Sequence, residues 1–132
     1  MAIEKINITS LLRLPSFCHC VRAGDFIFVS GTVGTDPKTN ELTPGGIAEQ
    51  TKQTLENIRV ILHEVGATFE DMVKVNVFIR DLNEFAEMNK VYIAIVGKDP
   101  PARITVGKAD LVFGALVEMD CIAYKEAKEN GS

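Results

Sequence analysis

Two stretches near the end of the chain place charged side chains inside segments that otherwise have the composition of β-strands. The first, 100–107, reads PPARITVG and carries Arg103; the second, 117–124, reads VEMDCIAY and carries Glu118 and Asp120. A guanidinium offers paired N–H donors that match the two oxygens of a carboxylate. A nearby carboxylate can hold a water molecule and accept its proton. Together these groups suit hydrolysis at the carbon next to the carboxylate of a small organic acid, without a metal or cofactor if the substrate is already electrophilic.

The alternation of side chains decides which of these groups share a face. In the first strand, predicted over 102–107, Arg103 lies on the polar face. In the second, predicted over about 115–124, Glu118 and Asp120 lie on the polar face. If the two polar faces lie in one cleft, the guanidinium and at least one carboxylate converge there. The alternative is an internal ion pair, in which Glu118 or Asp120 neutralises Arg103 and no ligand binds, because buried charges are usually paired.

Two helices and five or six strands are predicted to position these residues. Apolar residues recur at helical spacing in two segments, and Gly66 stands where the first helix needs a C-terminal cap. The predicted elements are a sixth strand at Ile3–Ile8, a hairpin turning at Val21–Phe26, a strand at Phe26–Gly31, a helix at 46–65, a strand at Met72–Arg80, a helix from a cap at Asp81 to Val96, and the two strands above. This order is typical of an α+β two-layer sandwich with both helices on one face.

Two helices can cover only one face of such a sheet. The strands Phe26–Val29 and Leu116–Ala123 are nevertheless apolar on both sides, so we expect them to be buried on both faces. The face away from the helices needs another partner, and a second copy of the chain is the simplest one. The pattern therefore predicts a homo-oligomer.

Composition narrows the class of protein. The chain has 132 residues, of which 46% are hydrophobic and 24% charged, as in one globular domain, 1–132. The net charge is −4 and the basic residues are scattered, which disfavours a nucleic-acid partner. Neither a membrane-spanning run nor a secretory signal is recognisable, so we expect a cytoplasmic protein, with an organelle left open. The polar tail, 125–132, is expected to fray.

The segment Cys18-His19-Cys20 contains residue types that bind metals. In a strand, Cys18 and Cys20 share one face and His19 points to the other, so the three side chains do not converge. Adding Cys121 and His63 gives no recognisable zinc spacing. We therefore predict no metal, thiols that are buried or half-buried in a reducing compartment, and surface histidines without a role.

The pair PPARITVG and VEMDCIAY resembles the signature of the Rid family of reactive-intermediate (imine) deaminases, also labelled L-PSP endoribonucleases or translation inhibitors. Three further stretches are similar to that family: DFIFVSGTVGTDPKTNEL at 25–42, GGIAEQTKQTLENIRVILHEVGA at 45–67 and VKVNVFIRDLNEFAEMNKVY at 73–92. The resemblance thus covers nearly the whole chain.

This resemblance implies a chorismate-mutase-like fold and a homotrimer, in which three sheets form a central barrel and ligand clefts lie between subunits. It implies enamine and imine substrates, such as 2-aminoacrylate and 2-iminobutanoate, which are hydrolysed to 2-keto acids and ammonia. Arg103 matches the residue that binds the substrate carboxylate, and Glu118 matches the residue that positions or activates water.

The resemblance also assigns binding positions and contains one departure. Matching positions near the ligand are Ser30, Gly31, Asn89, Tyr92 and Thr105. From the pattern alone, an asparagine such as Asn89 is more often a solvated amide than a ligand, and a tyrosine at helical spacing such as Tyr92 is more often a core residue. Many deaminases of the family have a tyrosine where this chain has Phe17. That ring can still wall the pocket, but any role of the hydroxyl in ordering water or moving a proton is lost.

Two other functions remain open at this stage. One is a ribonuclease or translation inhibitor, against which the acidic composition and the lack of paired histidines count. The other is a trimer without enzymatic activity, which binds a small organic acid or holds unfolded chains.

Overall fold

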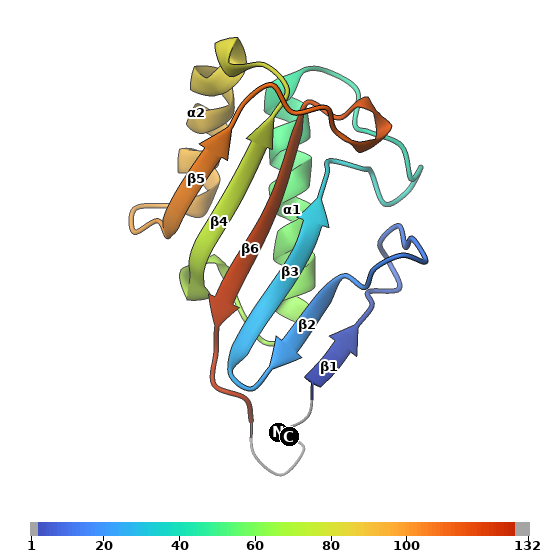
Figure 1. Ribbon diagram of the computed structural model, residues 1–132, viewed down its shortest axis with the longest axis vertical. Coiled ribbons are helices and arrows are strands. Elements are labelled where there is room, and N and C mark those ends of the chain that lie inside the picture. The colour runs from blue at the N-terminus through green and yellow to red at the C-terminus, as the bar shows by residue number, and fades with distance from the viewer. Residues whose placement is uncertain (1–2, 129–132) are drawn as a thin grey trace.

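The protein is described here by a computed structural model that covers residues 3–128 (Figure 1). Its strands are β1 (Ile3–Ile6), β2 (Cys20–Ala23), β3 (Phe26–Thr32), β4 (Met72–Ile79), β5 (Ala102–Val106) and β6 (Val117–Tyr124), and its α-helices are α1 (Ile47–Glu64) and α2 (Phe85–Val96). The strands form one sheet in the order β1-β2-β3-β6-β4-β5, in which only β4 and β5 are parallel. Both helices lie behind this sheet in Figure 1, which confirms the predicted two-layer α+β sandwich.

The core lies between the sheet and the helices. Alternate residues of the central strands face α1 and are buried, among them Ile27, Val77 and Met119. They pack against the apolar stripe of α1, which includes Leu55 and Ile58. This packing fixes which face of each strand is turned inward.

Helix α1 begins and ends as its sequence predicts. At its start, Glu49 Oε1 accepts a hydrogen bond of 2.8 Å from the backbone N–H of Gly46. At its end, Gly66 has a φ of +79°, which glycine adopts without strain. The backbone N–H of Gly66 donates to His63 and that of Ala67 donates to Leu62, so the last carbonyls of the helix are satisfied. These caps hold α1 to a defined length across the sheet.

The face of the sheet away from the helices is uncovered. In the single chain the side chains of Phe26 and Phe28, on the face that a second copy is expected to cover, are each 43% exposed. The reason is that α1 covers only the side of β3 that carries Ile27 and Val29. Tyr124, also 43% exposed, packs edge-on against Phe26 with ring centroids 5.1 Å apart. Together with Ile104 of β5, these side chains give the sheet an exposed apolar outer face.

The chain after β6 is held at its start by the β2–β3 hairpin. The backbone N–H of Lys125 donates to the carbonyl of Asp25, and that of Ala127 donates to its carboxylate, each over 2.9 Å. The end of the predicted tail, 129–132, lies outside the described residues. Within 3–128, the helices are too short or too polar to cross a membrane.

Candidate functional site

Arg103 and Glu118 do not meet within one chain. Arg103 pairs with Val75, which is buried against the helices, so its side chain points to the helical side of the sheet. Glu118 pairs with Phe78 on the outer face. The common cleft considered for these groups is therefore not formed within a single chain, because alternation tells which residues share a face of a strand but not which face each strand turns inward.

The Arg103 guanidinium is held by aromatic rings. Its Cζ lies 4.6 Å from the ring centroid of Tyr92 and 5.6 Å from that of Phe85. Such contacts attract a cation without neutralising it. Among residues 3–128 the one ion pair joins Arg59 and Glu56. The internal ion pair considered for Arg103 is therefore not formed within the chain.

A shallow cavity opens beside Arg103, at the edge strand β5 and the end of α2. Its lining includes Asn89, Tyr92, Lys98 and Arg103. Tyr92 is only 4% exposed, and within the described residues its hydroxyl has no hydrogen-bond partner. Burial raises the pKa of Tyr92, while the charge of Arg103 acts in the opposite direction. Tyr92 is thus both a core residue and the support of the guanidinium, and Asn89 lies where a ligand of Arg103 would reach it.

The carboxylate of Glu118 lies beside a bulge in β3. Val29 pairs with Cys121 and Thr32 with Met119, so β3 contains one extra residue at this point. Gly31 lies in the bulge, and a Cβ built there would collide with the Glu118 carboxylate. Because Gly31 has no side chain, there is room for the Glu118 carboxylate at this position.

The environment makes Glu118 a stronger base than an ordinary glutamate. Burial raises the pKa of Glu118 above its usual 4.5, and the negative charge of Asp120 raises it further. Asp120 itself accepts a hydrogen bond of 2.7 Å from Asn76 Nδ2, which holds it in place. A carboxylate in this setting is suited to accept a proton from water.

A second and deeper cavity extends from Glu118 beneath the N-terminal segment. Its lining consists of Leu11, Leu12, Leu14, Phe17, His19, Gly31, Thr32, Val33, Thr35, Asn57, Ile61, Val112, Phe113 and Glu118. Phe17, Gly31 and Glu118 were predicted as site residues and are brought together here. Sequence reasoning missed Phe113, whose φ of +61° is unusual for a bulky residue and places it at an exposed loop.

His19 is a structural residue of this cavity and not the expected surface histidine. It is 8% exposed. Its Nδ1 accepts a hydrogen bond from the backbone N–H of Ile8, and its Nε2 lies 2.8 Å from the carbonyl of Leu12. The neutral ring with the proton on Nε2 satisfies both contacts. His19 therefore fastens the N-terminal segment that walls the cavity.

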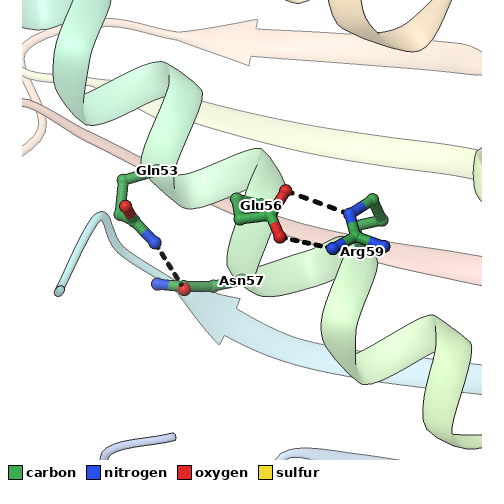
Figure 2. Close-up of polar contacts among 4 residues, drawn as sticks. All are labelled: Gln53, Glu56, Asn57 and Arg59. Carbon is green, nitrogen blue, oxygen red and sulfur yellow. Dashed lines mark hydrogen bonds and ion pairs between the residues drawn. The ribbon is translucent and has the colours of Figure 1, made fainter. Parts of the chain in front are cut away.

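Polar residues of α1 hold the loop on the other side of the cavity. Asn57 Nδ2 donates to the carbonyls of Val33 (3.1 Å) and Thr35 (2.9 Å). Figure 2 shows Gln53 donating to Asn57 Oδ1, over 2.9 Å, next to the exposed pair of Glu56 and Arg59. Asn57 is one of several buried polar residues of α1, together with Gln50, Thr51 and Thr54, so its position among apolar residues is the sequence signal for this role.

The remaining predicted positions lie elsewhere. Ser30 donates from its hydroxyl to the carbonyl of Cys18 over 2.7 Å, so it joins two segments near the site. Thr105 pairs with Val77 on the side of Arg103. Among the described residues, neither lines the two cavities above. Burial raises the pKa of Cys20 to about 11 and that of Cys121 to about 12, so both thiols keep their protons at neutral pH.

Comparison with known proteins adds to this geometry. Residues 8–125 match the profile of the family described as endoribonuclease L-PSP. A RutC family protein of Pyrococcus abyssi is 47% identical over 110 residues, which cover 83% of this chain and 87% of the relative. The 2-iminobutanoate/2-iminopropanoate deaminase of Rattus norvegicus is 39% identical over 93% of this chain and 91% of its own. The crystal structure of E. coli TdcF with bound serine superposes with a TM-score of 0.84 at 30% identity, over 93% of this chain and all of that one.

Proposed function

Because the chain belongs to the endoribonuclease L-PSP family, which matches residues 8–125, we propose that it hydrolyses reactive 2-imino acids and their enamine tautomers to 2-keto acids and ammonia. Relatives named 2-iminobutanoate/2-iminopropanoate deaminase support this reaction, at 34% to 39% identity. Substrates of the size of 2-aminoacrylate and 2-iminobutanoate are the starting point for tests.

The main observation that supports the proposal is that the Arg103 side chain is partly buried without a carboxylate partner among residues 3–128. Its guanidinium is supported by Tyr92 and Phe85 and has no carboxylate partner among residues 3–128. A partly buried cation without a counter-ion favours an anionic ligand, and its planar donors match a carboxylate. Arg103 is therefore assigned to the carboxylate of the imino acid, with Asn89 beside it.

The two cavities act as two halves of one site in an oligomer. One contains Arg103, on the helical side of the sheet, and the other contains Glu118, on the outer face, so one substrate reaches both groups only where two subunits meet. The exposed apolar outer face, with Phe26, Phe28 and Ile104, supports such packing because its burial is favourable. We assign this packing to a closed trimer, with Arg103 of one subunit facing Glu118 of the next.

The reaction then requires few groups. A water molecule held by the Glu118 carboxylate attacks C2 of the protonated imine, and Glu118 accepts the proton that the water loses. Glu118 then returns this proton to the amino group of the carbinolamine, the C–N bond breaks to release ammonia, and the hydroxyl proton passes to Glu118 while the C=O bond forms. For an enamine, a proton is first added to C3 to give the imine. Arg103 holds the carboxylate throughout, so that C2 stays next to Glu118.

The described residues offer little support for the alternative function of a ribonuclease. A ribonuclease of the usual kind needs acid–base side chains and a basic surface. Both ring nitrogens of His19 are engaged by the backbone, and the net charge of the chain is −4.

The test uses a pyridoxal-phosphate threonine dehydratase as the source of the imine. Release of 2-ketobutyrate and ammonia is followed with semicarbazide present to trap the imine that is not hydrolysed. The wild-type protein should increase the yield of keto acid, and Arg103→Ala should abolish the increase. Arg59→Ala is the matched control, because Arg59 lies exposed on α1 beside Glu56. Full activity in Arg103→Ala, or binding of 2-ketobutyrate without turnover by the wild type, would overturn the proposal.

A further inference from the structure

The cavity next to Glu118 has apolar walls beyond the point where the reaction takes place. Six of its lining residues are large hydrocarbons from three parts of the chain: Leu11, Leu12, Leu14 and Phe17 from the N-terminal segment, Ile61 from α1, and Phe113 from the loop before β6. Ile61 is 1% exposed, so it forms the floor. Phe17 and Phe113 are 44% and 57% exposed, so they form the rim.

Three polar side chains of the same cavity are already engaged with the protein. Both nitrogens of His19 contact backbone atoms of the N-terminal segment. The amide of Asn57 is used by Val33, Thr35 and Gln53. The hydroxyl of Thr32 donates to the carbonyl of Ser30 over 2.8 Å. Apart from Glu118 and the hydroxyl of Thr35, the lining therefore offers a polar group of a ligand few partners for the hydrogen bonds that it loses to water.

The orientation of the substrate follows from the two ends of the proposed site. If Arg103 of the neighbouring subunit holds the carboxylate and Glu118 faces C2, the substituent on C2 points away from Arg103, past Gly31 and into the apolar cavity. Gly31 lines this cavity without a side chain of its own, and the Glu118 carboxylate occupies the space next to its Cα. The cavity is therefore the place for the side chain of the imino acid.

We propose that the protein prefers 2-imino acids with branched or aromatic hydrocarbon side chains over 2-iminopropanoate and 2-iminobutanoate. This inference rests on the proposed function and adds the class of side chain. The apolar walls favour hydrocarbon, and the apolar residues that line the cavity together with Glu118 offer more contact than a methyl or ethyl group can use. The isobutyl imine should have a kcat/KM on the order of tenfold above that of the ethyl imine, since two further carbon atoms leave water.

The test compares a series of imines under one assay. An amino acid oxidase with catalase produces each imine from alanine, 2-aminobutyrate, leucine, phenylalanine or glutamine, and semicarbazide traps what is not hydrolysed. The expected order of kcat/KM places the leucine and phenylalanine imines first and the polar glutamine imine last. Leu12→Ser should lower the ratio of leucine to 2-aminobutyrate imine several-fold. Leu82→Ser, at an exposed leucine outside the cavity, should leave that ratio unchanged.

The outcomes separate the two levels of the argument. Hydrolysis of the ethyl imine as fast as or faster than the isobutyl imine would overturn the side-chain preference and leave the deaminase function standing. A glutamine imine that reacts as fast as the leucine imine would do the same. Absence of hydrolysis with every imine would remove the deaminase function, and the preference with it.

Discussion

Arg103 and Glu118 lie on opposite faces of the same sheet, with β4 between their strands. Arg103 is opposite Val75 on the helical side, and Glu118 is opposite Phe78 on the outer side. No side-chain movement within one chain brings these two groups onto one small molecule, because the sheet itself separates them. Their cooperation in a reaction therefore requires that one subunit supplies the guanidinium and another the carboxylate.

This relationship predicts complementation between two inactive variants. Arg103→Ala and Glu118→Gln should each lose imine hydrolysis. When they are unfolded together and refolded as a mixture, a ring that contains both variants regains one site with both groups intact. With random mixing into trimers, about three-quarters of the rings contain both, and each has one working site of three, which gives about a quarter of the wild-type activity.

The control for complementation is a mixture of Arg103→Ala with the double variant Arg103→Ala, Glu118→Gln. This mixture contains no intact Arg103 and should stay inactive at every ratio. If the first mixture also stays inactive although its subunits exchange, as followed by native mass spectrometry, the site is not shared between subunits.

The elevated pKa of Glu118 predicts the acidic limb of the pH–rate profile. The base form of Glu118 is lost as the pH falls through its pKa, which burial and Asp120 hold above 4.5. The acidic limb of kcat/KM should therefore lie at a pH higher than an ordinary glutamate gives. Asp120→Asn removes the negative charge but keeps the oxygen that Asn76 contacts, so it should move the limb to lower pH. A limb that does not move would show that Asp120 has no influence on the catalytic base.

The sequence was sufficient for the elements and insufficient for their mutual orientation. Helix α1 could be predicted because its apolar stripe and Gly66 are local signals that the structure bears out. The side of the sheet to which the Arg103 side chain points could not be predicted. This side depends on how β5 pairs with β4, and the two strands are distant in sequence. The same is true of His19, whose burial follows from hydrogen bonds to Ile8 and Leu12 and not from its own neighbours Cys18 and Cys20.

The exposed phenylalanines illustrate a different limit. The pattern of β3 correctly indicates a strand that is apolar on both sides, but only Ile27 and Val29 find a cover within the chain. The sequence around Phe113 does not indicate its place in the cavity, because that place comes from a loop conformation that puts Phe113 and Phe17 in the lining of one cavity. Residue type therefore does not predict which loop residues form the walls of this cavity.

The stacking of Arg103 on Tyr92 predicts different effects for two substitutions. Tyr92→Phe keeps the ring beneath the guanidinium and removes a buried hydroxyl that has no partner among the described residues, so stability and KM should change little. Tyr92→Leu removes the ring, and KM should rise about three- to tenfold as the guanidinium loses its support. The measurement is steady-state kinetics with the imine series. A large rise of KM in Tyr92→Phe would instead assign the hydroxyl to the substrate.

The hydrogen bonds from Asn57 to the loop at Val33 and Thr35 predict that one substitution will affect both stability and substrate binding. In Asn57→Ala, the carbonyls of Val33 and Thr35 lose their donor, and burial of unpaired carbonyls should cost about 2 kcal/mol in the free energy of unfolding. Denaturant titration at a fixed protomer concentration measures this loss. Because the released loop lines the Glu118 cavity, KM should also rise in the fraction that stays folded. Gln53→Ala, which removes only the outer contact to Asn57, is the matched control and should cost less than about 1 kcal/mol. Equal losses in the two variants would show that Asn57 does not hold the loop.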